Sequence, residues 1–372
     1  MEPFKTYVPE EVIVSPRVRV RRERMLRSLG QLFVRIGQLV HPHDVVAKGP
    51  GHTTIHLVDV AAELKLKPKA ALKAILVEPG QTVKAEELLA RQSGLFHRKE
   101  LRAPVDGRVM QIDPLGRVVL QVMAEGETLR AGLQGKVINL MPRHGVVIES
   151  VGAFVQGVWG NGRSHVGILR LLASSPDDQV SPEQFDVSVR GSIVVVGRTA
   201  SADVFEAAAR ARVHGLIMAS LRPELLDVAQ QQDYAVVVTE GVVGAAMAPP
   251  IFDILRRHDG HEAVVHAVFS PARPRLRPDI LIPLQVEDAP LFHAGRPLAT
   301  GDVVRLLAPP LLGKVGTVRD PWVGLGMLES GVEAEGCEVE LADGSVHFVP
   351  LHAVERLTGA ERLGEEEEPS EI

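Results

Sequence analysis

The stretch VEPGQTVKAEELLARQSGLFHRKELRAPVDGRVMQ, residues 77–111, decides how the first half of the chain is expected to fold. It predicts a short strand, a turn at Gly80, a second strand, and a third strand that is entered through APVDG at 103–107. Its front repeats an earlier segment, because VRIGQLV at 34–40 matches VEPGQTV at 77–83. The Gly-Gln pair, the valine three residues after the glycine, an acid seven residues after it and a closing alanine recur at an offset of 43 residues. Residues 30–175 are therefore predicted to form one domain that contains a repeated β-unit and ends in a hairpin.

The composition is that of a globular chain with several domains. It has 372 residues, of which 45% are apolar and 24% charged. The formal net charge of −6 argues against a surface that wraps nucleic acid or binds an anionic membrane. Cys337 is the single cysteine, so neither an internal disulfide nor a cysteine zinc cluster can form. The first residues lack the apolar core of a secretory signal, and no run is apolar enough to span a bilayer. We expect a cytoplasmic protein without a membrane partner.

The repeat region resembles the barrel-sandwich hybrid fold. Its two half-motifs and the run APVDGRV are similar to those of biotinyl/lipoyl-like domains, a fold that also occurs in efflux-pump adaptor proteins and in the large subunits of RNA polymerase. In carrier members of that family, a lysine on a tight hairpin before the Ala-Pro pair bears the cofactor. Phe96 takes that position here and Lys99 lies only four residues before Ala103, so the resemblance implies an unmodified module with no cofactor. Leu95 and Phe96 expose apolar surface at the loop tip, and with Arg98 they are the predicted partner-binding residues.

Two flanking segments have simpler interpretations. KLKPKAALKAIL at 65–76, between the two copies, predicts a short helix that begins near Pro68. Residues 1–29 predict an N-terminal strand region, with EVIV at 11–14 followed by a basic cluster. That cluster either forms an anion-binding edge or, as the nearby acids favour, a solvated face; its members are Arg17, Arg19, Arg21, Arg22, Arg24 and Arg27.

A hairpin is predicted at the end of the first domain. AFVQGVW at 153–159 and HVGILRL at 165–171 flank GNGRS at 160–164, and Asn-Gly between β-like runs favours a hairpin turn. The alternative is a phosphate-binding loop, which the glycines also suggest. Such loops open a helix, whereas a strand pattern follows here, so the hairpin is the better interpretation.

Residues 186–285 alternate strand and helix patterns, which predicts a small α/β domain with a partly parallel sheet. GSIVVVGRTASAD at 191–203 loosely resembles the swivelling β/β/α domains of phosphoenolpyruvate-using enzymes, but their Thr-Ser-His motif is missing, so phosphotransfer is not implied. Ligands of such sheets bind at the carboxyl ends of the strands, often at a helix N-terminus. The weak ligand-binding candidates for a small anion are therefore Arg198, Thr199, Ser201, Thr239 and Glu240. The alternative is ordinary helix capping by Thr199 and Ser201, with Arg198 solvated.

Residues 297–358 resemble a KOW-type SH3-like barrel, as found in transcription elongation factors and ribosomal proteins. The resemblance rests on strand patterns at 300–306 and 312–318 and on a hairpin turn at Asp343-Gly344. It implies an RNA, ribosome or polymerase partner. Acids outnumber lysines and arginines in this segment, which disfavours phosphate contact and favours a protein-facing or purely structural barrel. Residues 359–372 are predicted to be a disordered acidic tail.

No catalytic constellation is present in the sequence. The histidines at 41, 43, 52 and 56 raise the alternative of a zinc site, but the other repeat copy has Lys84 and Glu86 where the first two stand, which indicates exposed turns. His261 and His266 are five residues apart, so a helix would place them on different faces rather than on one metal. Acids surround Cys337 in the sequence and disfavour a thiolate nucleophile. We predict no metal site, no cofactor and no catalytic residue.

The predicted fold class is mixed, β-rich and multidomain: a barrel-sandwich hybrid, a small swivelling-like α/β domain and an SH3-like barrel. The favoured function is a non-enzymatic cytoplasmic scaffold or adaptor that binds protein partners through its β-modules. One alternative is a transcription- or translation-associated KOW protein, for which nucleic acid is a disfavoured partner because of the acidic charge. The other is an enzyme or small-anion-binding protein that uses the α/β cleft.

Overall fold

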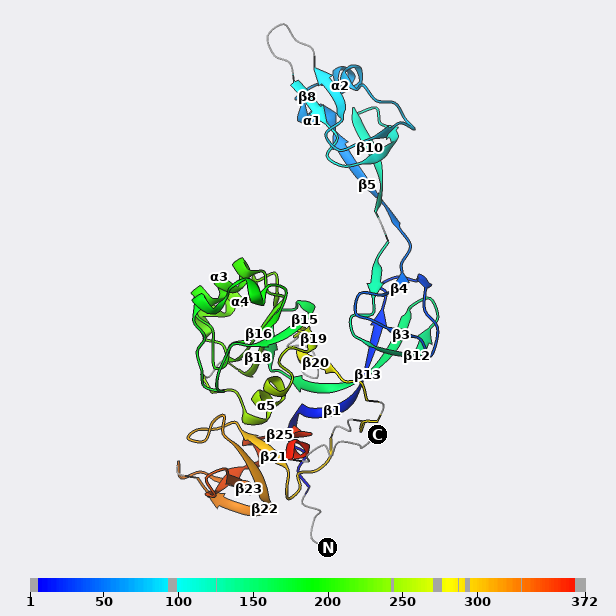
Figure 1. Cartoon of the computed structure of the whole chain (residues 1–372). Helices are drawn as coiled ribbons and strands as arrows, with labels where there is room; N and C mark the ends of the chain where they lie inside the picture. The colour runs from blue at the N-terminus through cyan, green and yellow to red at the C-terminus, as the bar shows by residue number, and fades with distance from the viewer. Residues whose placement is uncertain are drawn as a thin grey trace.

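The computed structural model describes residues 6–92, 99–124, 126–241, 244–269, 276–286, 288–291, 295–328 and 330–364. The predicted β-rich character is confirmed, since these residues form one mixed sheet of 16 strands and three smaller sheets. Figure 1 shows an elongated molecule, in which one small module stands at the end of an arm and the remaining domains surround strands β1 (Glu10–Met25) and β13 (Gly145–Gln156).

Strand β1 joins the N-terminal half of the chain to its C-terminal domain. Residues 14–25 pair antiparallel with β13, while residues 10–13 pair in parallel with β25 (Val354–Thr358). A bulge between Ser15 and Val18 interrupts the pairing with β13, as expected at Pro16, which has no N–H to donate. The predicted basic cluster is thus part of one long strand. Val12, Val14 and Val18 are buried, and the arginines project from the same strand.

Several of those arginines are paired. Arg22 lies 2.6 Å from Asp279, and Arg21 lies 2.8 Å from Glu149. The Nε of Arg24 donates to the carbonyl of Arg130. The basic stretch of β1 is therefore tied to its neighbours by ion pairs and hydrogen bonds rather than presented as an open anion-binding edge.

His266 lies beside this cluster and should make stability depend on pH. Burial, followed by the charges of Arg22 and Arg24, lowers the pKa of His266 to about 3. The folded protein therefore keeps His266 neutral, whereas the unfolded chain binds a proton below about pH 6.5. Between pH 7.5 and pH 5 the free energy of unfolding should fall by about 1–2 kcal/mol from this residue. Urea unfolding of the wild type and of His266→Gln at both pH values isolates the effect from that of Asp279, and equal pH dependence would contradict it.

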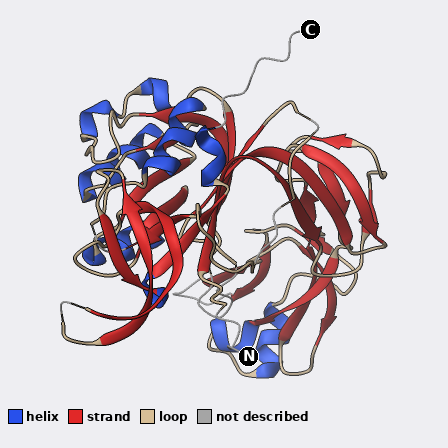
Figure 2. Ribbon diagram, turned by 90° about the horizontal axis from the view of Figure 1, so that it is seen from below, coloured by secondary structure: helices blue, strands red, loops and turns tan. Residues whose placement is uncertain are grey.

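The α/β region is built on four parallel strands: β15 (Ser164–Leu171), β16 (Ile193–Val195), β17 (Gly215–Ser220) and β18 (Ala235–Gly241). Helices α3 (Ala202–Ala211), α4 (Leu226–Gln230) and α5 (Pro249–Arg257) follow β16, β17 and β18. Figure 2 shows the helices gathered on one side of the molecule and in one further small group, with strands elsewhere. Antiparallel strands extend the sheet: β14 (Trp159–Gly160), β19 (Glu262–His266) and β20 (Asp279–Pro283). The region also contains three short 3-10 helices, η1 (Pro182–Gln184), η2 (Val187–Val189) and η3 (Pro223–Leu225). The predicted alternation of strand and helix is confirmed here.

The hairpin predicted at residues 153–171 was wrong. Strand β13 pairs with β1 and β20, the short β14 pairs with β18, and β15 pairs with β16 and β19. Asn161 is buried rather than exposed at a turn, because its side chain hydrogen-bonds to backbone groups around β18. Only Gly162 has the positive φ, +84°, that the motif suggested for both residues.

The C-terminal region is a run of antiparallel strands. Strands β21 (Val303–Leu306), β22 (Val315–Met327), β23 (Glu333–Leu341) and β24 (Val346–Pro350) pair in sequence, and β21 also pairs with β25. The predicted turn at Gly344 (φ +79°) joins β23 to β24, which confirms that hairpin. Two 3-10 turns, η4 (Leu351–Ala353) and η5 (Ala360–Gly364), flank β25.

Residues 30–144 form two bodies rather than the predicted single domain. Module A consists of β2 (Gln31–Leu32), β3 (Leu39–Val40), β4 (Val45–Lys48), β11 (Thr128–Arg130) and β12 (Gly135–Met141), and its core continues into the central sheet. Module B (residues 52–124) holds β5 (His52–Asp59), α1 (Val60–Glu63), α2 (Pro68–Ala74), β6 (Thr82–Val83), β7 (Leu88–Gln92), β8 (Lys99–Arg102), β9 (Gly107–Ile112) and β10 (Arg117–Ala124). Its core is separate, with all members between Val58 and Leu120. The predicted helix within 65–76 is confirmed as α2.

Candidate functional site

Modules A and B are copies of one β-unit, and their backbone hydrogen bonds coincide. The N–H of Gly37 donates to Val137 at 2.8 Å in module A, and the N–H of Gly80 donates to Val109 at 2.7 Å in module B. Both glycines have positive φ, +86° and +91°, which a side chain would strain. The two copies of the half-motif therefore have the same conformation but lie in different bodies.

The repeat is longer than the sequence comparison indicated. LRAGLQGKVI at 129–138 is the module A counterpart of LRAPVDGRVM at 101–110, at an offset of 28 residues. The N–H of Ala131 donates to Asp44 at 2.8 Å, as that of Ala103 does to Glu87 at 2.7 Å. A second search at a different offset would have found this half, because five identities occur in ten positions.

Module B is inserted into the hairpin of module A. In module B, β7 and β8 are antiparallel, and the chain between them is the six-residue segment SGLFHR, 93–98. In module A, the equivalent strands β4 and β11 are separated by the whole of residues 49–127. The N–H of Gly49 still donates to the carbonyl of Glu127 at 2.8 Å, so the hairpin stays closed beneath the insertion. Module B thus occupies the place of a loop tip.

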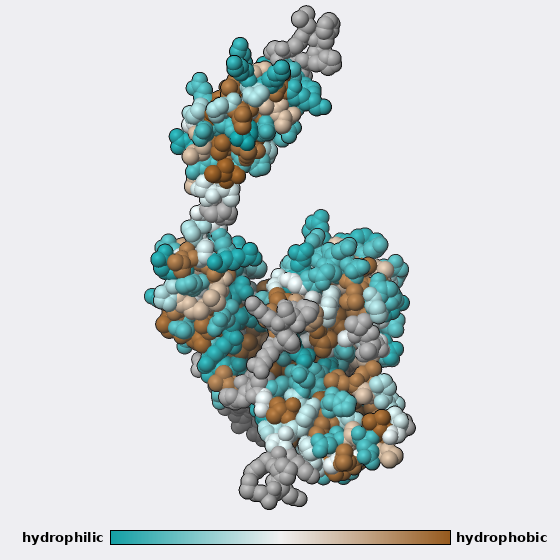
Figure 3. Space-filling model, turned by 180° about the vertical axis from the view of Figure 1, so that it is seen from behind, coloured by the Kyte–Doolittle hydropathy of each residue, from teal (hydrophilic) through white to brown (hydrophobic). Residues whose placement is uncertain are grey.

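The connection between the modules is a two-stranded ribbon. Strands β5 and β10 pair along their whole length, from Asp59 with Arg117 to His52 with Ala124. The ribbon exposes large apolar side chains, with Ile55 72% and Met123 81% accessible. Figure 3 shows module B standing clear of the other domains above a narrow neck. Since module B shares no buried core with the body, its surface is available on all sides except the neck.

Charge is divided unevenly between the two parts of the chain. Residues 1–144 carry 23 lysines and arginines against 15 acids, a formal charge of +8, and residues 145–372 carry 18 against 32, a charge of −14. A lysine corner on module B consists of Lys65, Lys67, Lys69 and Lys73, all exposed around α1 and α2. The net charge of the whole chain hid this division, and charge counted by segment would have revealed it.

The predicted loop-tip residues Leu95, Phe96 and Arg98 lie outside the described residues. The ligand-binding residues predicted for the α/β domain are described, and they separate into two groups. Ser201 caps α3, accepting the N–H of Val204 at 3.3 Å, and Arg198 lies 2.8 Å from Asp177. The Oγ1 of Thr199 lies 3.5 Å from the carbonyl of Ala200. The capping alternative therefore holds for Ser201, whereas Thr199 caps no helix N–H and Arg198 is ion-paired rather than solvated alone.

Thr239 and Glu240 belong to a buried interface instead. The guanidinium of Arg305, on β21, bridges Glu240 on β18 and Glu355 on β25, and also donates to the Thr239 carbonyl at 2.9 Å. Arg305 is 3% accessible and the Glu240 side chain 1%. Burial lowers the pKa of Arg305, but both carboxylates outweigh it and hold that pKa above its usual value. Glu240 therefore joins the α/β and C-terminal regions and is not open to a ligand.

A cleft of about 600 Å³ does exist at the carboxyl edge of the parallel strands, where the C-terminal region covers it. Arg198 lines it together with Met247, Lys314 and Asp343, and its other walls are mainly alanine, leucine and glycine. The N-terminus of α5 offers few amides here, because Pro249 and Pro250 have no N–H and the N–H of Ala248 is taken by Glu240. The cleft has the size of a small-molecule site, but its described lining residues offer no converging set of free polar groups.

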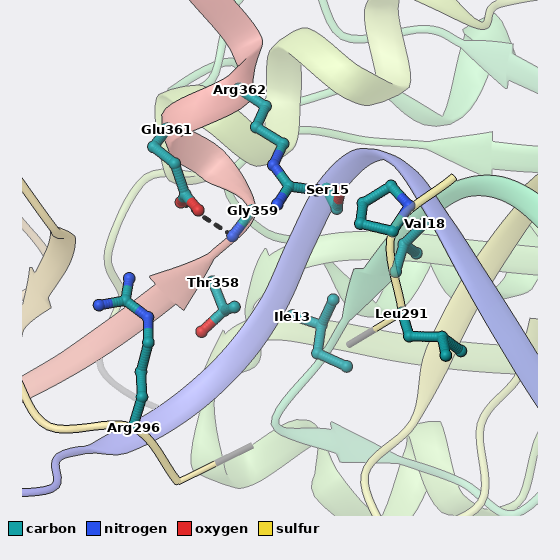
Figure 4. A pocket seen from close by; sticks show the side chains of 10 residues that line it. Ile13, Ser15, Val18, Leu291, Arg296, Thr358, Gly359, Glu361 and Arg362 are labelled. Carbon is teal, nitrogen blue, oxygen red and sulfur yellow. Dashed lines mark hydrogen bonds between the residues drawn. The ribbon is translucent and has the colours of Figure 1, made fainter. Parts of the chain in front are cut away.

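A smaller pocket of about 190 Å³ lies where β1 meets the end of β25 (Figure 4). Its floor is apolar, with Ile13, Val18 and Leu291. Two of its charged groups are engaged, since Arg296 pairs with Asp302 and Glu361 accepts the N–H of Gly359 at 2.9 Å. A Cβ on Gly359 would lie 2.6 Å from that of Ser15, so this junction depends on glycine. The pocket is best explained as part of the β1–β25 joint.

The described residues contain no group of three or more potential metal ligands. Cys337 is buried, and burial first of all raises its pKa to about 11, so it is a protonated thiol in the core of the C-terminal region. None of the described helices is long and apolar enough to cross a membrane. No protein-family model matches the chain, and no curated protein has a matching sequence.

Proposed function

We propose that the protein is a non-enzymatic cytoplasmic scaffold or adaptor, in which module B holds a protein partner away from the body. The observation that supports this proposal is the insertion of a second folded copy of the β-unit in place of a loop tip, with a core of its own. Within the described residues, module B shares no buried core with the rest of the chain, so its surface is free for contacts with other molecules. The buried, protonated Cys337 fits a reducing compartment.

The same proposal assigns fold types to the parts. Modules A and B are proposed to be barrel-sandwich hybrid units without an attached cofactor, and the C-terminal region a KOW-type SH3-like barrel. The α/β region is proposed to be swivelling-like. The two proposed β-modules, the barrel-sandwich hybrid and the SH3-like barrel, usually mediate contacts, which supports an adaptor more than an enzyme.

The internal repeat supplies the variant that tests the adaptor. Residues 50–126 are replaced by SGLFHR, the connection that closes the equivalent hairpin of module B. We expect a folded body, because the hydrogen bond between Gly49 and Glu127 and the core of module A remain. Pull-down from native lysate with mass spectrometry should then lose the partners that the full chain retains.

Circular dichroism and the fluorescence of Trp159 and Trp322, both outside the replaced segment, check that the body is intact. The control is the full chain with Leu115→Gln, a change at an exposed turn residue of module B that leaves its core in place. A folded variant that retains every partner would refute the role of module B.

A second candidate function is favoured by one observation, the +8 charge of residues 1–144 with the lysine corner at the far end of the arm. Clustered lysines bind phosphate backbones as point charges without sequence preference. We propose a transcription- or translation-associated protein as this alternative. Capture of RNA that is released by high salt would favour it, whereas a salt-resistant protein partner favours the adaptor.

A further inference from the structure

A third hollow, of about 460 Å³, lies at the amino edge of the parallel strands, opposite the cleft described above. Its walls are the segment that precedes β16 and the last turn of α3, which precedes β17. The lining residues are Phe185, Asp186, Val187, Arg190, Arg210, Ala211 and Arg212. Three arginines from two separate segments therefore share one concave surface, which neither the adaptor proposal nor the predicted ligand site uses.

The residues that line this hollow carry a net positive charge. Asp186 is committed locally, since its Oδ1 accepts from the N–H of Ser188 at 2.8 Å and from its hydroxyl at 2.6 Å. Those hydrogen bonds hold the pKa of Asp186 below its usual value, so it stays ionised and the lining carries a net charge of +2. Arg210 lies 3.8 Å from Glu206 in a well-exposed pair. Within the described residues, neither Arg190 nor Arg212 forms an ion pair.

Arg212 stands at a backbone position that glycine usually occupies. Arg212 ends α3 in the left-handed conformation, with φ +56°, where glycine is the usual residue. The cap itself is made by its backbone N–H, which donates to Ala208 and Ala209. Glycine could make the same bonds with less strain. A cation near the helix C-terminus is favourable, but Arg210 in the last turn already supplies one.

We propose that this hollow binds the phosphate group of a small phosphorylated molecule. A phosphate monoester carries close to two negative charges at neutral pH, which matches a lining charge of +2 better than a single carboxylate does. Guanidinium groups donate pairs of hydrogen bonds to phosphate oxygens, and arginine keeps its charge at every physiological pH. Phe185 supplies an apolar wall for the rest of the molecule, and the volume falls in the range of small-ligand sites.

Isothermal titration of the full chain with pyrophosphate at low salt tests the proposal. Arg190→Gln and Arg212→Gly should each weaken binding roughly tenfold or more, since each removes a charge-assisted pair. Arg256→Gln, which changes an exposed arginine on α5, is the matched control and should bind as the wild type does. Succinate, a dicarboxylate that carries two negative charges as a phosphate monoester does, should bind at least about tenfold more weakly than pyrophosphate.

The two site variants separate a ligand role from a structural one. Arg212→Gly should keep or raise the melting temperature, because it relieves the left-handed strain, while it loses pyrophosphate. Absence of binding by the wild type, equal binding of succinate, or unchanged affinity in both site variants would each overturn the proposal. So would equal weakening in Arg256→Gln, since that would indicate a general charge effect.

Discussion

Replacement of Arg305 by alanine should lower the free energy of unfolding by about 3–5 kcal/mol, one of the two largest losses expected from a single substitution in this chain. The loss arises from the buried polar groups that the substitution leaves without a partner. Glu240 and Glu355 would keep their charges in a buried interface, and the Thr239 carbonyl would lose its donor. An uncompensated buried carboxylate costs far more than an exposed ion pair contributes.

Arg277 can compensate only part of the buried negative charge that Arg305→Ala leaves. It lies 3.2 Å from the Oε1 of Glu355, but among the described residues Glu240 has no second cation, only the N–H of Ala248 and the hydroxyl of Thr239. Arg305→Lys keeps one charge but loses the planar fork that reaches both carboxylates, so its loss should be intermediate. The free energy of unfolding should therefore increase from Arg305→Ala to Arg305→Lys to the wild type.

Urea unfolding measures the effect, with Trp159 in the α/β region and Trp322 in the C-terminal region as fluorescent reporters. Arg319→Ala is the matched control, because Arg319 makes a short but exposed pair with Glu340, worth at most about 1 kcal/mol. A loss in Arg305→Ala no larger than in this control would show that the interface does not depend on the ion cluster. Separation of the two fluorescence transitions would show that Arg305 couples the regions.

This ion cluster also shows why the predicted ligand site differed from the structure. Thr239 and Glu240 were selected because they leave a parallel strand at its carboxyl end, and the structure places them there. What the sequence could not show is that Arg305, 65 residues further on, folds onto the same edge. The local pattern places a residue on its own strand, whereas the partner that buries it comes from another domain.

The repeat shows the opposite case, in which local pattern was sufficient. The Gly-Gln turns at Gly37 and Gly80 were recognised from spacing, and each has the positive φ and the hydrogen bond that the turn requires. The assignment of both copies to one domain failed because a strand hairpin can be interrupted without changing its own sequence. Residues 45–48 and 128–130 contain nothing that reveals the 79 residues between them. Only the second repeat, at 129–138, marks where module A resumes.

Replacement of Asn161 by alanine should cost about 3–5 kcal/mol of unfolding free energy. Its Oδ1 accepts the N–H of Val236 at 3.0 Å, and its Nδ2 donates to the carbonyls of Tyr234 at 2.9 Å and Ala229 at 3.2 Å. All of these groups are buried, so truncation leaves backbone donors and acceptors without partners, each at a cost of roughly 1–3 kcal/mol. A turn asparagine, as the Asn-Gly pattern suggested, would cost far less.

Asn161→Asp sharpens the test, because it keeps the shape and changes only the donor. An ionised carboxylate would face the Tyr234 and Ala229 carbonyls, so the variant should be at least as unstable as Asn161→Ala at pH 7. Burial raises the pKa of such a carboxyl, and its protonated form can donate again, so its deficit relative to the wild type should shrink as the pH falls. Asn139→Ala, at an exposed position of β12, is the control and should change stability by no more than about 0.5 kcal/mol. If urea unfolding showed an equally small change for Asn161→Ala, the hydrogen bonds of Asn161 around β18 would not contribute the expected stability.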